Sequence, residues 1–124
     1  AAGQGLWICA GMYEQTDGLP YNTIVVLDEC GNLRGAHRKT KLYDAFGYRE
    51  SDECRAGDTP FSPIDTPAGR LGVITCYELR FPALAAGQKA RGAQTLFVPA
   101  GWCAAQTSCS TGAHCCAPAR LRTA

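Results

Sequence analysis

The chain has 124 residues, of which 46% are apolar and 19% are charged, and its net charge is +1 at pH 7. This length allows one small domain with its own core, and the composition is typical of a folded globular protein rather than a disordered one. The basic residues are scattered, and no apolar run is long enough to span a bilayer. The sequence therefore predicts neither a nucleic-acid partner nor a membrane partner.

The cysteines and the N-terminus indicate the compartment. Most of the eight cysteines lie far apart in different local patterns, and Cys109, Cys115 and Cys116 crowd the tail. The first residues lack the basic segment of a secretory signal peptide. We therefore expect free thiols in a reducing compartment, and so a cytoplasmic protein. The chain also lacks an initiator methionine, and we expect it to be cut from something longer.

The first third of the chain reads as strands separated by turns. Residues 5–13 (GLWICAGMY) form an apolar run that predicts a buried strand. A turn with Asp17-Gly18 follows, and the β-branched run 21–27 predicts a second strand, paired with the first as a hairpin. Beyond a turn through Gly31, residues 33–38 predict a third strand.

The remaining elements alternate between strand and helix. Residues 40–63 are predicted to be irregular, and a stretch of that length inside a compact domain is usually functional. A turn is expected at 65–70, a strand at 71–75, a helix at 82–91 and a strand at 95–99. Hairpins followed by strand–helix–strand predict a mixed α/β domain.

Cys76 lies where the strand gives way to the helix that Pro82 opens. This arrangement is typical of a nucleophile elbow, because the positive end of a helix favours a thiolate. The alternative is a buried structural cysteine, since cysteine is among the most buried residue types. The local sequence does not decide between the two.

Three charged residues are the other candidates for a site. Lys39 follows the third strand, Glu50 lies in the long irregular stretch, and Arg80 lies four positions after Cys76. Taken singly, each has an ordinary interpretation: a solvated lysine at a strand end, a loop acid and a surface or ion-paired arginine.

Seven segments in order resemble the nitrilase, or carbon–nitrogen hydrolase, superfamily across residues 1–102. They are AGMYE (10–14), YNTIVVLDECGNL (21–33), HRKTKLYD (37–44), GYRESD (47–52), AGDTPF (56–61), PAGRLGVITCYELRFPALA (67–85) and RGAQTLFVPAGW (91–102). The resemblance implies part of an α-β-β-α sandwich, incomplete at both ends. It also implies a Glu-Lys-Cys triad with no cofactor and no metal, and a homo-oligomer in the full-length form.

The resemblance also implies the catalytic roles. Cys76 matches the nucleophile, Lys39 the triad lysine and Glu50 an accessory glutamate that positions the lysine or the water. A thiolate at Cys76 would attack an amide carbonyl to form a thioester, which water then hydrolyses. Lys39 would favour the thiolate and stabilise the oxyanion, with the backbone N–H of Tyr77 as the second donor.

Two further residues are expected to contact substrate. Arg80 matches a residue that grips the substrate's acid group in some members that recognise carboxylates, and Trp102 lies near the family's site region. An ion-paired arginine and an aromatic residue closing the edge of the core remain alternatives. Cys9, on an apolar strand, is expected in the core, and His37 is a poor metal ligand because it has no partner at ligand spacing.

The resemblance stops at both ends of the chain. The triad glutamate has no counterpart, and Glu14 is no substitute, because it lies on the strand that follows that segment. We predict a partial hydrolase domain at 1–102 and a tail at 103–124 that is not family-like. Our hypothesis is that the tail is the product of a frameshift. Codons can be chosen for the tail that, when the reading frame is shifted by one nucleotide, encode a sequence very similar to the helix expected from the family.

Three functions remain open. The first is an amidase acting on a small carboxylate-bearing amide, an ω-amide or an N-carbamoyl amino acid, with nitriles less favoured. The second is a catalytically dead remnant of such an enzyme, and we expect the 124-residue chain itself to be inactive. The third is a zinc-binding module in the tail, which adjacent cysteines disfavour; its ligands would be Cys103, Cys109, His114, Cys115 and Cys116.

Overall fold

The computed structural model describes residues 3–101. The strands are β1 (Ile8–Glu14), β2 (Tyr21–Leu27), β3 (Leu33–Arg38), β4 (Asp44–Ala45), β5 (Tyr48–Arg49), β6 (Ile64–Thr66), β7 (Gly69–Val73) and β8 (Thr95–Phe97). Between them lie the 3-10 helices η1 (Glu50–Asp52) and η2 (Cys76–Arg80) and the α-helix α1 (Pro82–Ala90). The predicted substrate residue Trp102, the tail domain and the tail's metal candidates lie outside the described residues.

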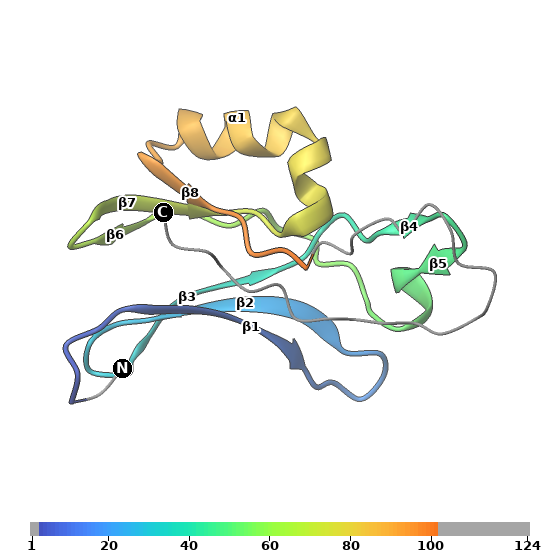
Figure 1. Ribbon diagram of the computed structural model, residues 1–124, viewed down its shortest axis with the longest axis horizontal. Helices are drawn as coiled ribbons and strands as arrows, with labels where there is room; N and C mark the ends of the chain where they lie inside the picture. The colour runs from blue at the N-terminus through green and yellow to red at the C-terminus, as the bar shows by residue number, and fades with distance from the viewer. Residues whose placement is uncertain (1–2, 102–124) are drawn as a thin grey trace, which may run out of the picture.

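Two three-stranded sheets face each other, and α1 covers the outer side of the second (Figure 1). The first sheet is the antiparallel meander β1-β2-β3, in which β2 is central. In the second sheet, β6 and β7 form a hairpin, whereas β7 and β8 run parallel. A parallel pair needs a crossover connection, and η2 and α1 provide it. The described part thus contains three of the four layers predicted.

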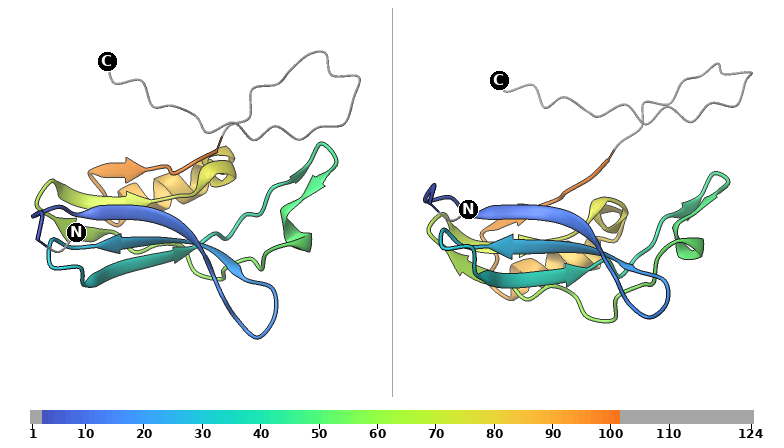
Figure 2. Two further views of the ribbon diagram at one scale, coloured as in Figure 1. Left: turned by 60° about the horizontal axis from the view of Figure 1, so that its bottom comes forward. Right: turned by 90° about the horizontal axis from the view of Figure 1, so that it is seen from below.

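The core lies between the sheets. Ile24 and Val26 of β2 pack against Phe61 and against Leu71 and Val73 of β7, and all five are buried. Removing this apolar surface from water is the main force that holds the layers together, at about 25 cal/mol per Å². The β4–β5 hairpin projects away from both sheets in every view (Figures 1 and 2).

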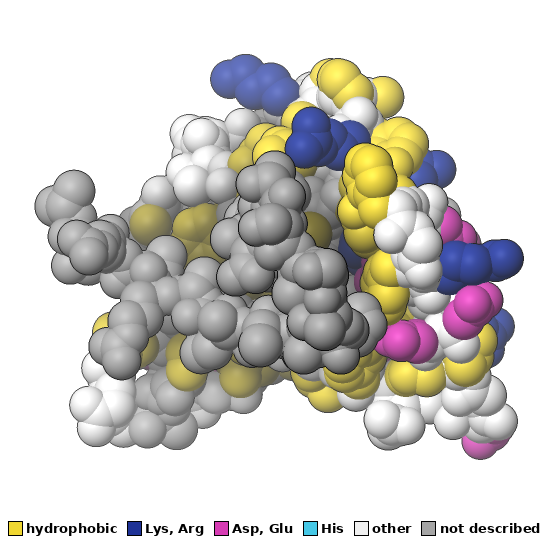
Figure 3. Space-filling view, turned by 45° about the vertical axis from the view of Figure 1, so that its right-hand side comes forward, with side chains coloured by type: hydrophobic (Ala, Val, Ile, Leu, Met, Phe, Trp, Pro, Cys, Tyr) yellow, Lys and Arg dark blue, Asp and Glu magenta, His cyan; other side chains and the backbone are white. Residues whose placement is uncertain are grey.

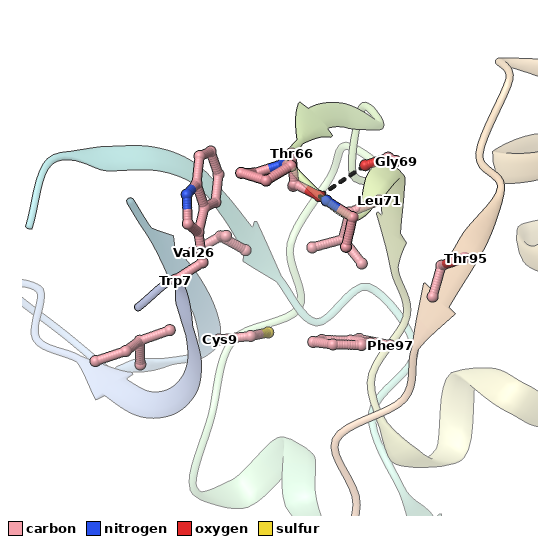
Figure 4. A pocket seen from close by; sticks show the side chains of 11 residues that line it. Trp7, Cys9, Val26, Thr66, Gly69, Leu71, Thr95 and Phe97 are labelled. Atoms are coloured by element: carbon pink, nitrogen blue, oxygen red, sulfur yellow. Dashed lines mark hydrogen bonds between the residues drawn. The ribbon is translucent and has the colours of Figure 1, made fainter. Parts of the chain in front are cut away.

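An apolar pocket of about 190 Å³ remains between the sheets at the end away from the β4–β5 hairpin. Trp7, Cys9 and Val26 line it from the first sheet's side, and Leu71 and Phe97 from the second (Figure 4). Cys9, predicted in the core, is half-buried there and packs against the core cluster.

The structure corrects three predicted elements. Residues 5–13 are not a buried strand: β1 is an edge strand that pairs only with β2 among the described residues, and Met12 and Tyr13 are exposed. Residues 65–70 are not only a turn, because β6 ends and β7 begins within them. The stretch 40–63 is not wholly irregular either, since it contains β4, β5 and η1.

The other elements agree with prediction to within a few residues. The second and third strands and the helix fall where the sequence places them, and β7 and β8 are shifted or shortened by about two residues. In the described part, no helix is long and apolar enough to cross a membrane.

Candidate active site

A cleft of about 970 Å³ opens where the ends of both sheets meet the β4–β5 hairpin. Its volume lies within the usual range for small-molecule sites. Its lining comprises Gly11, Asn22, Ile24, Lys39, Tyr43, Ala45, Phe46, Tyr48, Glu50, Thr75, Cys76, Tyr77, Arg80, Pro99, Ala100 and Gly101. With the side that carries the hairpin turned forward, hydrophobic side chains form a band bordered by charged ones (Figure 3). Five of the six predicted site residues line this one cleft.

Lys39 and Glu50 form a buried ion pair in the cleft. The Lys39 Nζ lies 2.6 Å from Glu50 Oε2, and their side chains are 3% and 8% exposed. Both residues therefore differ from the solvated lysine and the loop acid that their local sequence would suggest. Burial of an unpaired charge is costly, so each charge depends on the other.

The backbone holds Lys39 in place at the end of β3. Its N–H donates to the carbonyl of Asn22 at 2.8 Å, and its own carbonyl accepts from the N–H of Gly57 at 2.8 Å. Gly57 is required here because a Cβ at this position would overlap the backbone oxygen of Arg38. The strand end is thus clamped between β2 and the loop that carries Gly57.

Glu50 accepts hydrogen bonds from three sides. Besides Lys39, the side chain of Asn22 donates to Oε1 at 2.9 Å and the N–H of Tyr43 donates to Oε2 at 2.7 Å. Burial raises the pKa of the Glu50 carboxyl, but these donors together outweigh it and hold that pKa below its usual value. Glu50 is thus an ionised anchor for Lys39.

Cys76 adopts a strained backbone conformation at the mouth of the turn, with a φ of +46°. Residues other than glycine rarely adopt this left-handed region, and such strain persists only when the surroundings impose it. The N–H of Cys76 donates to the carbonyl of Pro99 at 2.9 Å, and the N–H of Ile74 donates to that of Phe97 at 3.1 Å. The turn at Cys76 therefore has the strained geometry of an elbow.

The elbow differs from the prediction in one respect. The strand ends at Val73 and Cys76 begins the 3-10 helix η2, so α1 starts only at Pro82. The helix terminus next to the sulfur thus belongs to a five-residue 3-10 helix rather than to α1. The reason is Pro82, which favours the first position of a new α-helix.

Tyr77 and Arg80 also come from η2. The N–H of Tyr77 forms no hydrogen bond with another described residue, so it is available as a donor at the cleft. Arg80, the last residue of η2, is exposed at the cleft and has no carboxylate partner among the described residues. The ion-paired alternative for Arg80 therefore finds no support in the described part of the chain.

Glu78 is a buried carboxylate that no sequence pattern had marked as a site residue. This carboxylate is fully buried and accepts hydrogen bonds from His37, Thr40 and the backbone of Thr75. The pattern Thr75-x-x-Glu78 is the signature of a capping box, which could have indicated that the glutamate turns back toward the chain before it. His37 is thus a partner of Glu78 through its Nε2.

Apart from Glu50 and Cys76, no carboxylate or thiol among the described residues lines the cleft. Glu14 pairs with Arg38 and accepts from Thr23, and it does not line the cleft. Within residues 3–101, no group of three His, Cys, Asp or Glu side chains is arranged to hold a metal ion. Four thiols in this range, those of Cys9, Cys30, Cys54 and Cys76, are free.

Comparison with known proteins shows the family to which the chain is similar. The carbon–nitrogen hydrolase family model matches residues 1–120. Deaminated glutathione amidase of Escherichia coli O157:H7 is 39% identical over 87 residues, which cover 70% of this chain and 33% of the relative. N-carbamoylputrescine amidase of Solanum tuberosum is 32% identical over 95 residues, covering 77% and 32%.

A solved structure shows the same fold. The crystal structure of the NitFhit protein of Caenorhabditis elegans superposes with a TM-score of 0.75 at 34% identity, over 79% of this chain and 26% of that one. The chain therefore spans about a third of the length of the two amidases and about a quarter of the NitFhit chain.

Proposed function

Because the chain belongs to the carbon–nitrogen hydrolase family, we propose that its cleft is part of an amidase site in which Cys76 attacks the carbonyl carbon of a small amide. The observation that carries this proposal is the placement of Cys76, in a strained turn, on the same cleft as the buried Lys39–Glu50 pair. A strained nucleophile that shares a cleft with a fixed cation suits covalent acyl transfer.

The proposed reaction proceeds through two tetrahedral intermediates. The Cys76 thiolate forms a C–S bond to the carbonyl carbon, and the oxyanion is stabilised by the Lys39 ammonium and the Tyr77 N–H. The C–N bond then breaks, and the thiol's proton, held by a carboxylate base, leaves with the ammonia. The same base takes a proton from a water molecule, whose oxygen attacks the thioester carbon; the C–S bond breaks, the acid is released and the proton returns to the Cys76 sulfur.

Glu50 fits the role of a positioning group better than that of the base. Its carboxylate is already engaged by Lys39, Asn22 and Tyr43, and its pKa is held below its usual value. A general base works best when its pKa lies near the working pH. The base is therefore expected to be the triad glutamate that the family resemblance implies, which has no counterpart among the residues of this chain.

The substrate class is proposed from Arg80. The two amidase relatives carry the names of different substrates, deaminated glutathione and N-carbamoylputrescine, so the family alone does not select one. Arg80 is a cation at the cleft with no carboxylate partner among the described residues. A guanidinium binds a carboxylate through two parallel hydrogen bonds, which favours an ω-amide or an N-carbamoyl amino acid.

Ammonia release tests this proposal on the gene product that contains this sequence. The substrates are ω-amides, N-carbamoyl amino acids, neutral amides and nitriles, and the controls are Cys76→Ala, expected to be inactive, and Cys30→Ala, expected to retain activity. Release that is fastest from the carboxylate-bearing amides supports the proposal. No release from any substrate, with Cys76 no more reactive toward an electrophile than Cys30, would instead identify a catalytically dead remnant.

A further inference from the structure

Glu78 is the most completely engaged carboxylate in the described part of the molecule. Its side chain is 0% exposed, and four donors surround it. The N–H and the hydroxyl of Thr40 each donate to Oε1 at 2.7 Å. The N–H of Thr75 donates to Oε2 at 2.7 Å, and His37 Nε2 lies 2.7 Å from the same oxygen.

The charge state of this group follows from its partners. Burial raises the pKa of the Glu78 carboxyl, but the hydrogen bonds from His37 and Thr40 outweigh it and lower that pKa to about 2. An ionised carboxylate only accepts, so the hydrogen between Glu78 and His37 is carried by Nε2. The Nδ1 of His37 is buried and has no partner among the described residues.

The four donors come from two segments that carry site residues. His37 and Thr40 lie on either side of Lys39, at the end of β3, and Thr75 directly precedes Cys76. Glu78 itself lies two residues after Cys76 and does not line the cleft. One buried carboxylate therefore ties the lysine's backbone to the backbone of the cysteine's strained turn.

We propose that Glu78 is a positioning residue that sets the Lys39 ammonium relative to the Cys76 thiol. This inference rests on the proposed function, because it assumes that Cys76 is the nucleophile. Glu78 acts through the two segments and touches no substrate. Its loss shifts the lysine away from the sulfur, and a displacement of about 1 Å between catalytic groups costs on the order of a hundredfold in rate.

Glutamine cannot replace Glu78 without conflict. Each carboxylate oxygen accepts from one backbone N–H, that of Thr40 at Oε1 and that of Thr75 at Oε2. In either orientation, the amide NH₂ of glutamine points at one of these N–H groups, so two donors face each other. Aspartate keeps the charge but is shorter by one methylene, so it is expected to retain part of the network.

The test measures the alkylation of Cys76 by iodoacetamide, by peptide mass spectrometry, in the gene product that contains this sequence. Cys30 is exposed and does not line the cleft, so it serves as the internal reference. The chains compared are the wild type, Glu78→Gln, Glu78→Asp and, as a charge-matched control on an exposed turn, Asp17→Asn. Melting curves recorded alongside give the folded fraction of each variant.

We expect the Cys76-to-Cys30 rate ratio to fall about tenfold in Glu78→Gln, less in Glu78→Asp and not at all in Asp17→Asn. A purely structural role would lower the melting temperature but leave this ratio unchanged in the folded fraction, and that result would overturn the proposal. A wild-type ratio near one would instead overturn the proposed function, because Cys76 would then not be activated.

If Glu78→Gln does not fold, Thr40→Val provides a second test of the proposal. It removes only the hydroxyl donor to Glu78 and leaves the backbone donor in place. Thr40→Ser keeps the hydroxyl and is its matched control. A fall in the Cys76-to-Cys30 ratio in Thr40→Val that Thr40→Ser does not share supports the positioning role, and equal ratios in both variants contradict it.

Discussion

The Lys39 ammonium lies 2.6 Å from the Glu50 carboxylate, and water reaches almost none of either side chain. Opposite charges attract strongly in such a place, but each also depends on its partner to offset its loss of hydration. Removing one partner is therefore expected to cost more stability than removing both.

Lys39→Met tests this dependence. The substitution leaves the Glu50 charge buried with only the donors of Asn22 and Tyr43, so the free energy of unfolding is expected to fall by about 3–5 kcal/mol. Urea denaturation measures the change. The double variant Lys39→Met/Glu50→Gln should recover part of the loss, and effects that simply add would show that the two charges are not coupled.

Lys41→Met is the matched control for this measurement. Lys41 lies two residues after Lys39 and is exposed, and its ammonium lies 5.7 Å from the centre of the Phe81 ring. Its removal is expected to change the free energy of unfolding by less than about 0.5 kcal/mol. A loss as large as that of Lys39→Met would mean that the whole segment, rather than the ion pair, controls stability.

Acid is expected to destabilise the fold through Glu78. Its pKa falls from a usual value of 4.5 to about 2 on folding, so the unfolded chain binds the proton more tightly than the native chain does. The stability that Glu78 contributes is complete above about pH 5 and is lost as the pH falls from there toward 2. Glu50, whose pKa is also lowered, adds to the loss in the same direction.

Urea midpoints at pH 7, 5, 4 and 3 measure this effect. The urea midpoint of the wild type should be nearly constant between pH 7 and 5 and should fall below pH 5. The urea midpoint of Glu78→Gln should depend less on pH. Glu14 has a pKa lowered to about 2 by its hydrogen bond from Arg38, but this pair is partly exposed, so salt should screen its share. An identical acid response in Glu78→Gln would contradict the assignment to Glu78.

Gly57→Ala is expected to disturb the strand end that carries Lys39. A new Cβ would overlap the carbonyl oxygen and Cβ of Arg38, while the Gly57 N–H holds the Lys39 carbonyl. The predicted loss is about 1–3 kcal/mol, seen as a melting temperature lower by several degrees. Gly18→Ala is the control, because nothing lies within 4 Å of its added Cβ, and an equal effect there would refute the steric explanation.

The layers and most strands could be predicted because their signals are local. The family and the mixed α/β class are confirmed by the family match and by the similarity to the NitFhit structure. The run 21–27 is rich in β-branched residues, and the helix begins at Pro82. By contrast, β4 and β5 have two residues each, too few to carry a periodic pattern. Their turn depends on Phe46 and Gly47, both of which have a positive φ.

Local sequence patterns could not predict which charged side chains of the site are buried. Lys39 and Glu50 look like solvent-exposed charges until the fold closes over them, and only the family resemblance marked them in advance. The roles implied by the family resemblance did not include Glu78, and local patterns could not reveal it because its hydrogen-bond donors come from segments up to 41 residues away. The exposure of β1 is the opposite case, since an apolar run cannot reveal that its strand lies at an edge.

Arg80→Met is expected to change which substrates bind rather than how fast they react. A guanidinium–carboxylate contact is worth about 1.5–3 kcal/mol, so KM for a carboxylate-bearing amide should rise about 10- to 100-fold. The contact is made equally in the ground state and the transition state, so kcat should change little. KM for a neutral amide of similar size should stay the same.

Steady-state ammonia release by the gene product that contains this sequence measures both constants. Arg34→Met is the matched control, because Arg34 is exposed on β3 and does not line the cleft. Equal losses for the acidic and the neutral amide would mean that Arg80 supports the shape of η2 and not the substrate. A fall in kcat alone, with KM unchanged, would place the effect of Arg80 on the neighbouring turn of Cys76 instead.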